Sequence, residues 1–305
     1  MNPVIKDSAV PSVDMIWPDA DAVRVWTCRG RAILPAERPL IMGIVNVTPD
    51  SFSDGGRYAN SDRAVAHGLK MLEQGADIID VGGESTRPGA AAVDAAEEAR
   101  RVIPVIRELR RHVTVPVSVD TMKAAVARQA LEAGADIIND VSALTHDPDM
   151  PALARETKAG VVLMHMQGTP RTMQNYPEYA DVMGDVVDFL EARVRDLAQV
   201  GLDPAAMAVD PGIGFGKTLE HNLALLAHVD RFHRLGRPVV IGLSRKSFLG
   251  TLTGRDADDR LAGSLAALAV CAWQGAEILR VHDVQESADA VRVVAALRRS
   301  GNGVE

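Results

Sequence analysis

Polar side chains stand at the ends of short apolar runs along the whole sequence. Asn46 follows the run at 41–45, and Asp210 ends the run that begins at 206. If these runs are parallel strands of one barrel, their carboxyl ends meet at one mouth, which the side chains then share. The set comprises Asn46, Asp80, Asp120, Asn139, Asp210, Lys246 and Arg280, with His282 close behind. Any one of them alone could be an ordinary strand-end or helix-cap residue.

The acids and the amide of this set predict the kind of ligand. Asp80, Asp120 and Asp210 would repel one another at a shared mouth unless a ligand supplied hydrogen-bond donors. A heterocycle with a guanidine-like edge could donate to the acids and to Asn139, while Lys246 could meet a ring carbonyl on the same edge. A pterin has this pattern, and a purine matches it in part.

Basic residues late in the chain predict an oxyanion site beside that ligand. Arg280 and His282 are two residues apart on one expected strand, so they point to the same face. The segment 244–247, Ser-Arg-Lys-Ser, adds basic and hydroxyl groups at the end of the preceding strand. The alternative is that Arg280 only forms an ion pair with one of the acids. Asn46 could serve as a neutral oxygen ligand for Mg²⁺ that shares a ligand phosphate, and Mn²⁺ would suit the same atoms.

Two glycine-containing segments need separate explanations. Residues 46–56 carry two carboxylates, one amide, three hydroxyl groups and one phenylalanine after an apolar run, which is typical of a ligand-holding loop. Residues 210–217 match two phosphate-binding patterns only superficially. Pro211 stands where the nucleotide-hydrolase loop needs glycine, and Lys217 stands where the dinucleotide fingerprint needs its third glycine. The glycines instead favour a tight turn that approaches a flat ligand beside Phe215.

The sequence does not favour covalent catalysis. Neither a Gly-x-Ser-x-Gly elbow nor a Cys/His pairing stands out. His165 ends an apolar run, and its role stays open. The chemistry is therefore expected to rest on positioning and charge stabilisation.

Eight apolar runs bounded by glycine or polar residues predict eight strands. They lie at 41–47, 77–82, 115–120, 136–141, 160–166, 206–210, 238–243 and 277–282. Amphipathic stretches between them predict helices, among them 63–74, 95–110, 123–133 and 181–200. The repeated alternation of strand and helix predicts an α/β fold, the (β/α)₈ TIM barrel. An open doubly wound sheet is the alternative.

The barrel is expected over about 39–300. Residues 23–34 contain two short apolar runs around a Cys-Arg-Gly turn and predict a hairpin that caps one end. Residues 1–22 hold three prolines and four aspartates without a stable period, and they predict an irregular arm. Hairpin and barrel together are expected to form a single catalytic domain over 23–300.

Composition excludes several classes of protein. The formal net charge is −8 over 305 residues, which argues against a nucleic-acid surface. Cys28 and Cys271 lie far apart in the sequence and favour a reducing compartment. No basic segment precedes an apolar run at the N-terminus, and no run approaches about eighteen apolar residues. A cytoplasmic protein without membrane insertion is expected.

Eight short motifs carry the candidate residues in order along the chain. They are residues 46–56, DVGGESTRPG at 80–89, SVDT at 118–121, INDVS at 138–142, MHMQG at 164–168, residues 210–217, SRKS at 244–247 and RVHD at 280–283. In this order the chain resembles the dihydropteroate synthase family over about 39–284. The resemblance implies a pterin-binding (β/α)₈ barrel and a transferase of folate biosynthesis. Such enzymes condense 6-hydroxymethyl-7,8-dihydropterin diphosphate with 4-aminobenzoate and release diphosphate and 7,8-dihydropteroate.

The same resemblance assigns roles to residues of this sequence. The pterin would contact Asp80, Asp120, Asn139, Met164, Asp210, Phe215 and Lys246. The diphosphate would contact Asn46, Thr86, Arg87, Arg280 and His282, with Asn46 also binding Mg²⁺. The aminobenzoate would contact Ser51, Phe52, Thr86, Arg87, Pro88, Lys246 and Ser247. The catalytic residues would be Asp54, Lys246 and Arg280.

The resemblance also implies a mechanism and partners. Mg²⁺ and Arg280 would stabilise the departing diphosphate, and Asp54 would favour the pterin cation before the aryl amine attacks. Sulfonamides would compete with aminobenzoate, and the protein would form a homodimer. Two alternatives belong to other functional classes. One is a pterin-binding methyltransferase domain, against which the segments at 51–54 and 244–247 argue, and the other is a non-catalytic pterin-binding paralogue.

Overall fold

Eight parallel strands form the centre of the molecule. The structure, a computed structural model, describes residues 24–33, 37–48, 57–85, 89–90 and 92–301, so the arm predicted over 1–22 lies outside the described residues. The strands are β3 (Leu40–Asn46), β4 (Ile78–Gly82), β5 (Val117–Asp120), β6 (Ile137–Asp140), β7 (Gly160–Met164), β8 (Met207–Asp210), β9 (Val240–Gly242) and β10 (Ile278–Val281). Most of their residues are buried, as expected for Val- and Ile-rich parallel strands that are covered on both faces.

The strands close into a barrel. Their order is β8-β7-β6-β5-β4-β3-β10-β9, and every neighbouring pair is parallel. A parallel bridge between Val209 and Val239 joins β8 to the segment that enters β9, and the Val209 amide donates to the Pro238 carbonyl over 2.9 Å. This closure confirms the predicted (β/α)₈ barrel, and the open-sheet alternative is wrong.

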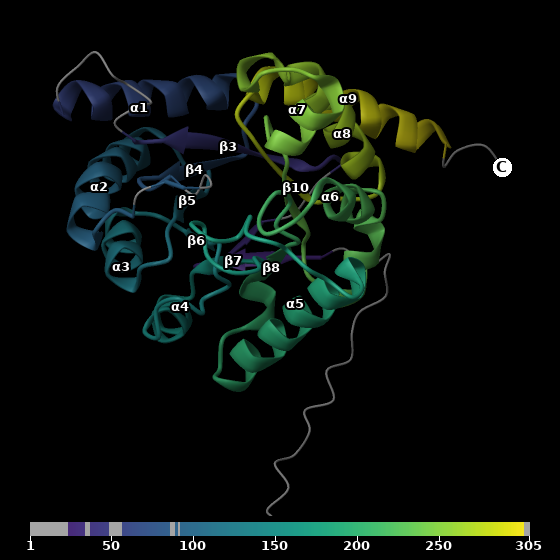
Figure 1. Cartoon of the computed structure of the whole chain (residues 1–305). Helices are drawn as coiled ribbons and strands as arrows, with labels where there is room; N and C mark the ends of the chain where they lie inside the picture. The colour runs from purple at the N-terminus through teal and green to yellow at the C-terminus, as the bar shows by residue number, and fades with distance from the viewer. Residues whose placement is uncertain (1–23, 34–36, 49–56, 86–88, 91, 302–305) are drawn as a thin grey trace, which may run out of the picture.

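Helices surround the strands in chain order (Figure 1). They are α1 (Arg57–Glu73), α2 (Ala95–His112), α3 (Ala124–Ala133), α4 (Met150–Thr157), α5 (Val182–Gln199), α6 (Leu219–Leu226), α7 (Ser247–Thr253), α8 (Leu261–Trp273) and α9 (Val284–Gly301). Local sequence signals set several boundaries: Asp94 caps α2 by accepting from the Glu97 amide at 2.8 Å, and Gly134 ends α3 at a φ of 113°. The helices expected at 63–74, 95–110, 123–133 and 181–200 are confirmed as α1, α2, α3 and α5.

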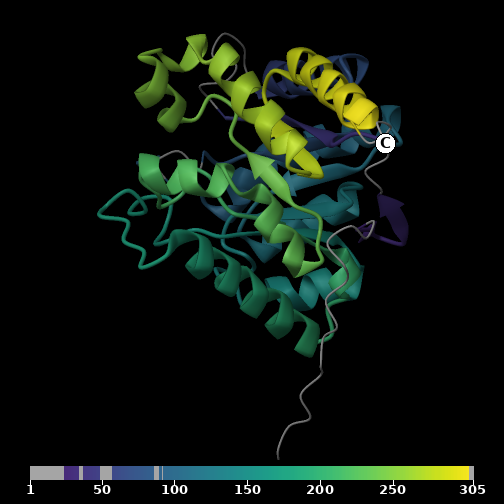
Figure 2. The same ribbon diagram turned by 90° about the vertical axis from the view of Figure 1, so that its right-hand side faces the viewer.

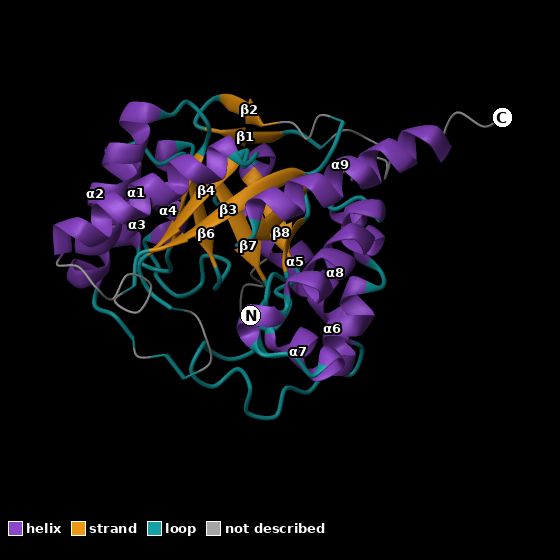
Figure 3. Cartoon of the chain, turned by 90° about the horizontal axis from the view of Figure 1, so that it is seen from above, coloured by secondary structure: helices purple, strands orange, loops and turns teal. Residues whose placement is uncertain are grey.

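A hairpin covers the end of the barrel where the strands begin. Its strands are β1 (Trp26–Cys28) and β2 (Arg31–Ile33), and they lie opposite the loops that follow the barrel strands (Figures 2 and 3). Trp26, Cys28 and Ile33 pack into a small core with interior strand residues such as Met42 and Ile78. The hairpin therefore caps the barrel as predicted and leaves the opposite end to carry the chemistry.

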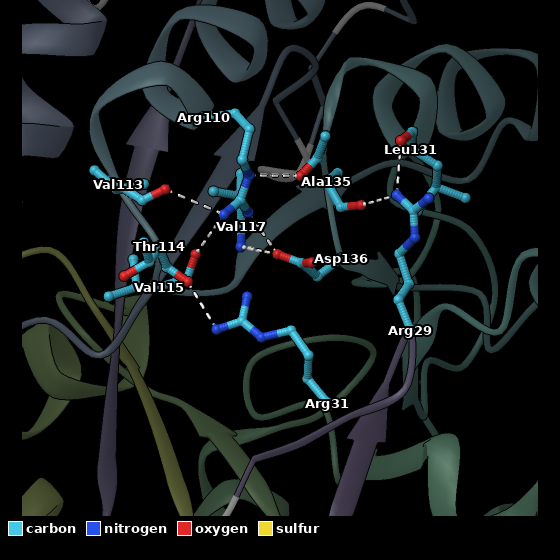
Figure 4. A network of polar contacts seen from close by, with 11 residues as sticks. Arg29, Arg31, Arg110, Val113, Thr114, Val115, Val117, Leu131, Ala135 and Asp136 are labelled. Atoms are coloured by element: carbon cyan, nitrogen blue, oxygen red, sulfur yellow. Dashed lines mark hydrogen bonds and ion pairs between the residues drawn. The ribbon is translucent and has the colours of Figure 1, made fainter.

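An arginine network fastens the hairpin end (Figure 4). Arg110 forms a 2.5 Å ion pair with Asp136, whose carboxylate also accepts from the Val117 amide at 3.0 Å. Arg29 donates from Nη1 to the carbonyls of Leu131 and Ala135 at 2.8 and 2.9 Å. These bonds satisfy carbonyl groups near the end of α3, so this end of the barrel serves stability.

Two further predictions concern cysteines and membranes. Burial raises the pKa of both Cys28 and Cys271, that of Cys271 to about 12, so neither thiol is a reactive nucleophile at neutral pH. Within the described part of the chain, no helix combines the length and apolar character needed to cross a membrane.

Candidate active site

The predicted site residues that the structure describes lie at the end of the barrel opposite the hairpin. Asn46, Asp80, Asp120, Asn139, Met164, Asp210 and Arg280 are on β3, β4, β5, β6, β7, β8 and β10, respectively, and Phe215, Lys246, Ser247 and His282 follow β8, β9 and β10. Ser51, Phe52, Asp54, Thr86, Arg87 and Pro88 lie outside the described residues. The strand-end rule thus gathers seven strand residues of the predicted set around one mouth.

Arg280 forms ion pairs with two acids of the mouth. Its Nε donates to Asp80 Oδ2 and its Nη2 to Asp120 Oδ2, each over 2.7 Å. About a fifth of its side chain, 21%, stays exposed. The sequence left open whether Arg280 forms an ion pair with one of the acids, and the structure shows that it pairs with two of them. The pairing leaves the cation positioned at the mouth.

Asp80 lies beneath the mouth. Its side chain has no exposed area, and its Oδ2 accepts from Asn139 Nδ2 at 3.2 Å as well as from Arg280. The prediction that Asp80 contacts the pterin directly stays a prediction, and the contacts present give Asp80 a supporting position. It acts on the site by orienting Arg280 and Asn139, which lie nearer to the opening.

The carboxylate of Asp120 experiences opposing influences. Burial raises its pKa, the Arg280 guanidinium lowers it, and the nearby Asp80 carboxylate raises it. The expected repulsion among the acids is thus relieved in part by an internal cation. An incoming ligand needs to supply fewer donors than the sequence suggested.

Lys246 lies over an aromatic ring. Its Nζ is 4.4 Å from the Phe215 ring centroid and donates to the carbonyl of Ile213. Burial lowers the pKa of Lys246 to about 7, against the effect of the Asp210 carboxylate. Gly214 has a φ of +81°, and a Cβ there would lie 2.9 Å from Lys246 Cδ. The glycine therefore makes room for the lysine stem.

Asp210 is held in one orientation. It is 6% exposed, and its Oδ1 accepts from the Gly212 amide at 2.7 Å. Burial raises its pKa, while the Lys246 ammonium opposes that rise. A fixed carboxylate beside a cation is suited to receive a donor edge of a flat heterocycle.

Two glycines leave space between these groups. A Cβ on Gly242 would lie 3.9 Å from Arg280 Cδ and 4.0 Å from Asp210 Oδ2. A Cβ on Gly82 would lie 3.7 Å from Asp120 Oδ2 and 3.8 Å from Asn46 Oδ1. Asp210 and Arg280 therefore face one small space, and Asn46 and Asp120 face another.

Oxygen atoms of two side chains border the second space. Asn46 Oδ1 and the Asp120 carboxylate supply oxygen ligands, which Mg²⁺ prefers, and Mg²⁺ commonly completes its shell with phosphate and water. Among the described residues, no cluster of three or more His, Cys, Asp or Glu side chains could hold a metal alone. A metal ion at this point would therefore need further ligands, such as the oxygens of a phosphorylated ligand, because Asp120 Oδ2 also accepts from Arg280.

The segments after β9 and β10 are joined by side chains. Arg245, with a left-handed φ of 58°, donates from Nε to Asp283 at 2.9 Å. His282 Nδ1 lies 3.2 Å from Ser244 Oγ. The sequence placed Ser244 and Arg245 in the oxyanion set, but these contacts give them the role of joining the two strand ends. Ser247 begins α7 and is exposed.

Sequence reasoning left the role of His165 open and assigned no role to Lys217. Lys217 is 3% exposed, and its Nζ lies 3.0 Å from His165 Nδ1. In the sequence, Lys217 served only to exclude the dinucleotide fingerprint. Its position in a glycine-rich loop gave no signal that the side chain turns inward, because that direction depends on the fold of the loop.

Comparisons with known proteins agree with this geometry. Residues 42–282 match a family described as pterin binding enzyme. A dihydropteroate synthase of Escherichia coli (strain K12) is 48% identical over 263 residues, which cover 86% of this chain and 93% of that protein. The chain belongs to the dihydropteroate synthase family. A dihydropteroate synthase of Bacillus subtilis (strain 168) is 42% identical over 283 residues, which cover 92% of this chain and 96% of that protein.

Solved structures of dihydropteroate synthases share the fold. A Yersinia pestis enzyme in complex with a sulfonamide drug superimposes with a TM-score of 0.85 at 45% identity, covering 90% of this chain and 99% of that one. A Xanthomonas albilineans enzyme in complex with 7,8-dihydropteroate gives a TM-score of 0.81 at 45% identity, covering 92% and 100%. The barrel described above is thus the barrel of the dihydropteroate synthase family.

Proposed function

We propose that this protein condenses 6-hydroxymethyl-7,8-dihydropterin diphosphate with 4-aminobenzoate to give 7,8-dihydropteroate and diphosphate. The observation that carries the proposal is that Asp210 and the cation Arg280 face one small space at the mouth. The donor edge of a pterin needs a hydrogen-bond acceptor such as the Asp210 carboxylate. Its diphosphate needs a cation such as Arg280. Membership of the dihydropteroate synthase family supports the same reaction.

The pterin ring would lie among the groups at the mouth. Asp120, Asn139 and Asp210 would accept from its amino and ring N–H groups. Lys246 would donate to the ring carbonyl when it turns from the Ile213 carbonyl. Met164 and Phe215 would provide apolar contacts for the flat ring.

The reaction breaks one bond and forms another at the methylene carbon of the pterin. The C–O bond to the diphosphate breaks, the electron pair leaves with the diphosphate, and Arg280 stabilises the negative charge. His282 follows Arg280 by two residues in the chain and would also contact the phosphate oxygens. The aminobenzoate nitrogen then forms the C–N bond and loses one proton to solvent.

A divalent cation is proposed beside Asn46 Oδ1, with the Asp120 carboxylate nearby. Mg²⁺, bound there by oxygen ligands, would neutralise charge on the diphosphate. Asn46 would orient this part of the substrate, and Asp120 would share its carboxylate between the pterin and Arg280.

The remaining assignments rest on the family resemblance. Asp54 would favour the pterin cation, and Ser51, Phe52, Thr86, Arg87 and Pro88 would surround the aminobenzoate, together with Lys246 and the exposed Ser247. We extend the expectation of sulfonamide competition to this chain, because a Yersinia pestis relative is described in complex with a sulfonamide drug.

We further propose a homodimer that uses α8 and α9. Helix α8 is apolar around most of its circumference, yet only Ser264, Leu268, Cys271 and Ala272 are buried. Val270 and Trp273 on α8 are 51% and 53% exposed, and Val293 and Leu297 on α9 are 60% and 56% exposed. A helix that is apolar on its outer face is expected to be covered by a partner. A cytoplasmic location is proposed with it, in keeping with two free, buried cysteines.

The decisive test of the activity is product formation by the purified protein. Incubation with the dihydropterin diphosphate, 4-aminobenzoate and Mg²⁺ should yield dihydropteroate, identified by mass. A protein that binds the pterin but forms no product would be the non-catalytic paralogue. Methyl transfer from a methylated pterin to a corrinoid protein, without dihydropteroate formation, would support the methyltransferase alternative.

A further inference from the structure

A buried polar pair lies behind the proposed pterin site. Lys217 Nζ is 3.0 Å from His165 Nδ1, 3.0 Å from the Phe215 carbonyl oxygen and 3.4 Å from the His165 carbonyl oxygen. Lys217 is 3% exposed and His165 is 7% exposed. The three acceptors match the three N–H donors of an ammonium group.

We propose that Lys217 and His165 are positioning residues that hold the Phe215 and Lys246 side chains in the arrangement that binds the pterin. The proposal rests on the proposed pterin site and adds two residues to its support. Lys217 comes from the loop after β8, and His165 directly follows β7, so their contact joins two neighbouring strand ends.

The histidine ring is well suited to act as a fixed acceptor. Burial lowers the pKa of His165 to about 3, so the ring is neutral at physiological pH. An ammonium group that donates to Nδ1 requires the tautomer with its proton on Nε2. The ring packs edge-on against Phe189 of α5 at 5.0 Å between centroids and lies 5.9 Å from Tyr179.

Close backbone packing makes the contact between the two loops rigid. A Cβ on Gly212 would lie 1.9 Å from the His165 carbonyl oxygen, and a Cβ on Gly216 would lie 2.6 Å from the Gln167 carbonyl oxygen. Both glycines have positive φ, 68° and 59°. Tyr179 donates to the Gly216 carbonyl at 2.7 Å. The hydrogen bonds of Lys217 therefore add polar contacts to an already tight interface between the two loops.

The effect reaches the site through Phe215. Lys217 Nζ donates to the Phe215 carbonyl. The centroid of the Phe215 ring lies 4.4 Å from Lys246 Nζ, and Lys246 also donates to the carbonyl of Ile213 in the same loop. Movement of this loop would change the position of the Lys246 ammonium. The charged groups that act on Lys217 are Asp210 and Lys246 itself, so the pair is electrostatically linked to the mouth as well.

The first test is a double-mutant cycle with a phosphate-free probe, 6-hydroxymethylpterin. Lys217→Met should raise its Kd about tenfold in the wild-type background. In the Lys246→Met background, the same change should raise the Kd less than about threefold, because the residue that Lys217 positions is already absent. Equal losses in both backgrounds, or no loss in either, would overturn the proposal and reduce Lys217 to a structural residue.

A second test changes the acceptor. His165→Asn keeps an oxygen acceptor near the position of Nδ1, whereas His165→Leu removes it and leaves Lys217 without that partner. Binding of the probe should stay within about threefold of wild type for the first variant and weaken about tenfold for the second. Equal binding by the two variants would contradict the proposal, and their comparison is available even if Lys217→Met fails to fold. Failure of the wild-type protein to bind the probe would instead contradict the proposed function.

Discussion

Arg280 on β10 donates a 2.7 Å hydrogen bond from Nε to Oδ2 of Asp80 on β4, although 200 residues separate them in the chain. Only β3 stands between these two strands in the sheet. Asp80 is fully buried, whereas Arg280 is partly exposed. The buried carboxylate therefore orients the cation that would meet the diphosphate.

Replacing Asp80 by asparagine should harm both stability and turnover. The change keeps the shape of the side chain but removes the charge that compensates Arg280 in a buried environment. We expect a loss of about 3 kcal/mol in the free energy of unfolding, measured by urea denaturation. We also expect kcat/KM for the dihydropterin diphosphate to fall about 100-fold, because a misplaced catalytic group is costly.

The exposed pair of Asp289 and Arg292 is the matched control. Their side chains are 64% and 59% exposed, so Asp289→Asn should change stability by no more than about 0.5 kcal/mol and leave turnover intact. Similar losses for the two variants would show that Asp80 has no special role in the site.

Gly242→Ala should block ligand binding while the fold is retained. The new methyl group would enter the space between Asp210 and Arg280 at ordinary contact distances, 3.9–4.0 Å, and no backbone strain is required. We expect the Kd of 6-hydroxymethylpterin to rise at least about tenfold, measured by calorimetry, with an unchanged unfolding midpoint. Gly263→Ala on α8 has similar spacing to its neighbours and should bind normally. Normal binding by Gly242→Ala would place the ligand elsewhere.

The affinity for the pterin should depend on pH through Lys246. Burial lowers the pKa of this lysine to about 7, so the ammonium donor is present below that pH and lost above it. Binding of phosphate-free pterin should therefore weaken by as much as about tenfold per pH unit above 7. Lys246→Arg stays protonated throughout this range and should lose this dependence. An equally steep dependence in the arginine variant would assign the titration to another group.

Lys217 should make the stability of the protein depend on pH. Burial lowers its pKa from 10.5 to about 7 in the folded state. Between these two values the unfolded chain binds one more proton than the folded chain, so this lysine makes unfolding less favourable as the pH rises. The contribution is at most about 1.4 kcal/mol per pH unit. Urea denaturation should show that the free energy of unfolding rises more between pH 7 and pH 9 for wild type than for Lys217→Met. An equal rise in the two proteins would contradict the lowered pKa of Lys217.

The apolar face of α8 and α9 should hold the dimer together. A double change, Val270→Asp with Trp273→Arg, would place charges on a surface that a partner is expected to cover. Sedimentation should then show a monomer at concentrations where wild type is a dimer. Leu252→Arg on α7, which is also about half exposed, should leave the dimer unchanged. A monomeric wild type would contradict the assignment.

The barrel was predictable because its signals are local. The strands are short runs rich in Val and Ile with polar residues at or near their ends, and most helices have an apolar face at helical spacing. The hairpin was predictable from its turn and flanking runs. Asn46, Asp120, Asn139 and Asp210 could be placed at the mouth because the ends of parallel strands in a barrel meet there.

Depth within the barrel was not predictable in the same way. Asp80 lies two residues before the end of β4, and alternation along a strand cannot tell whether such a residue reaches the opening or stays below it. The inward turn of Lys217 depends on positive φ angles at Gly212 and Gly216 and on backbone contact with His165 and Gln167. These contacts join separate loops, so no local pattern records them.

Simultaneous measurement of dihydropteroate and diphosphate tests the central claim most directly. The purified protein, Mg²⁺, the dihydropterin diphosphate and 4-aminobenzoate should give the two products in equal amounts, and Arg280→Met should abolish both while still binding 6-hydroxymethylpterin. Absence of dihydropteroate from wild type, with pterin binding confirmed in the same sample, would contradict the account.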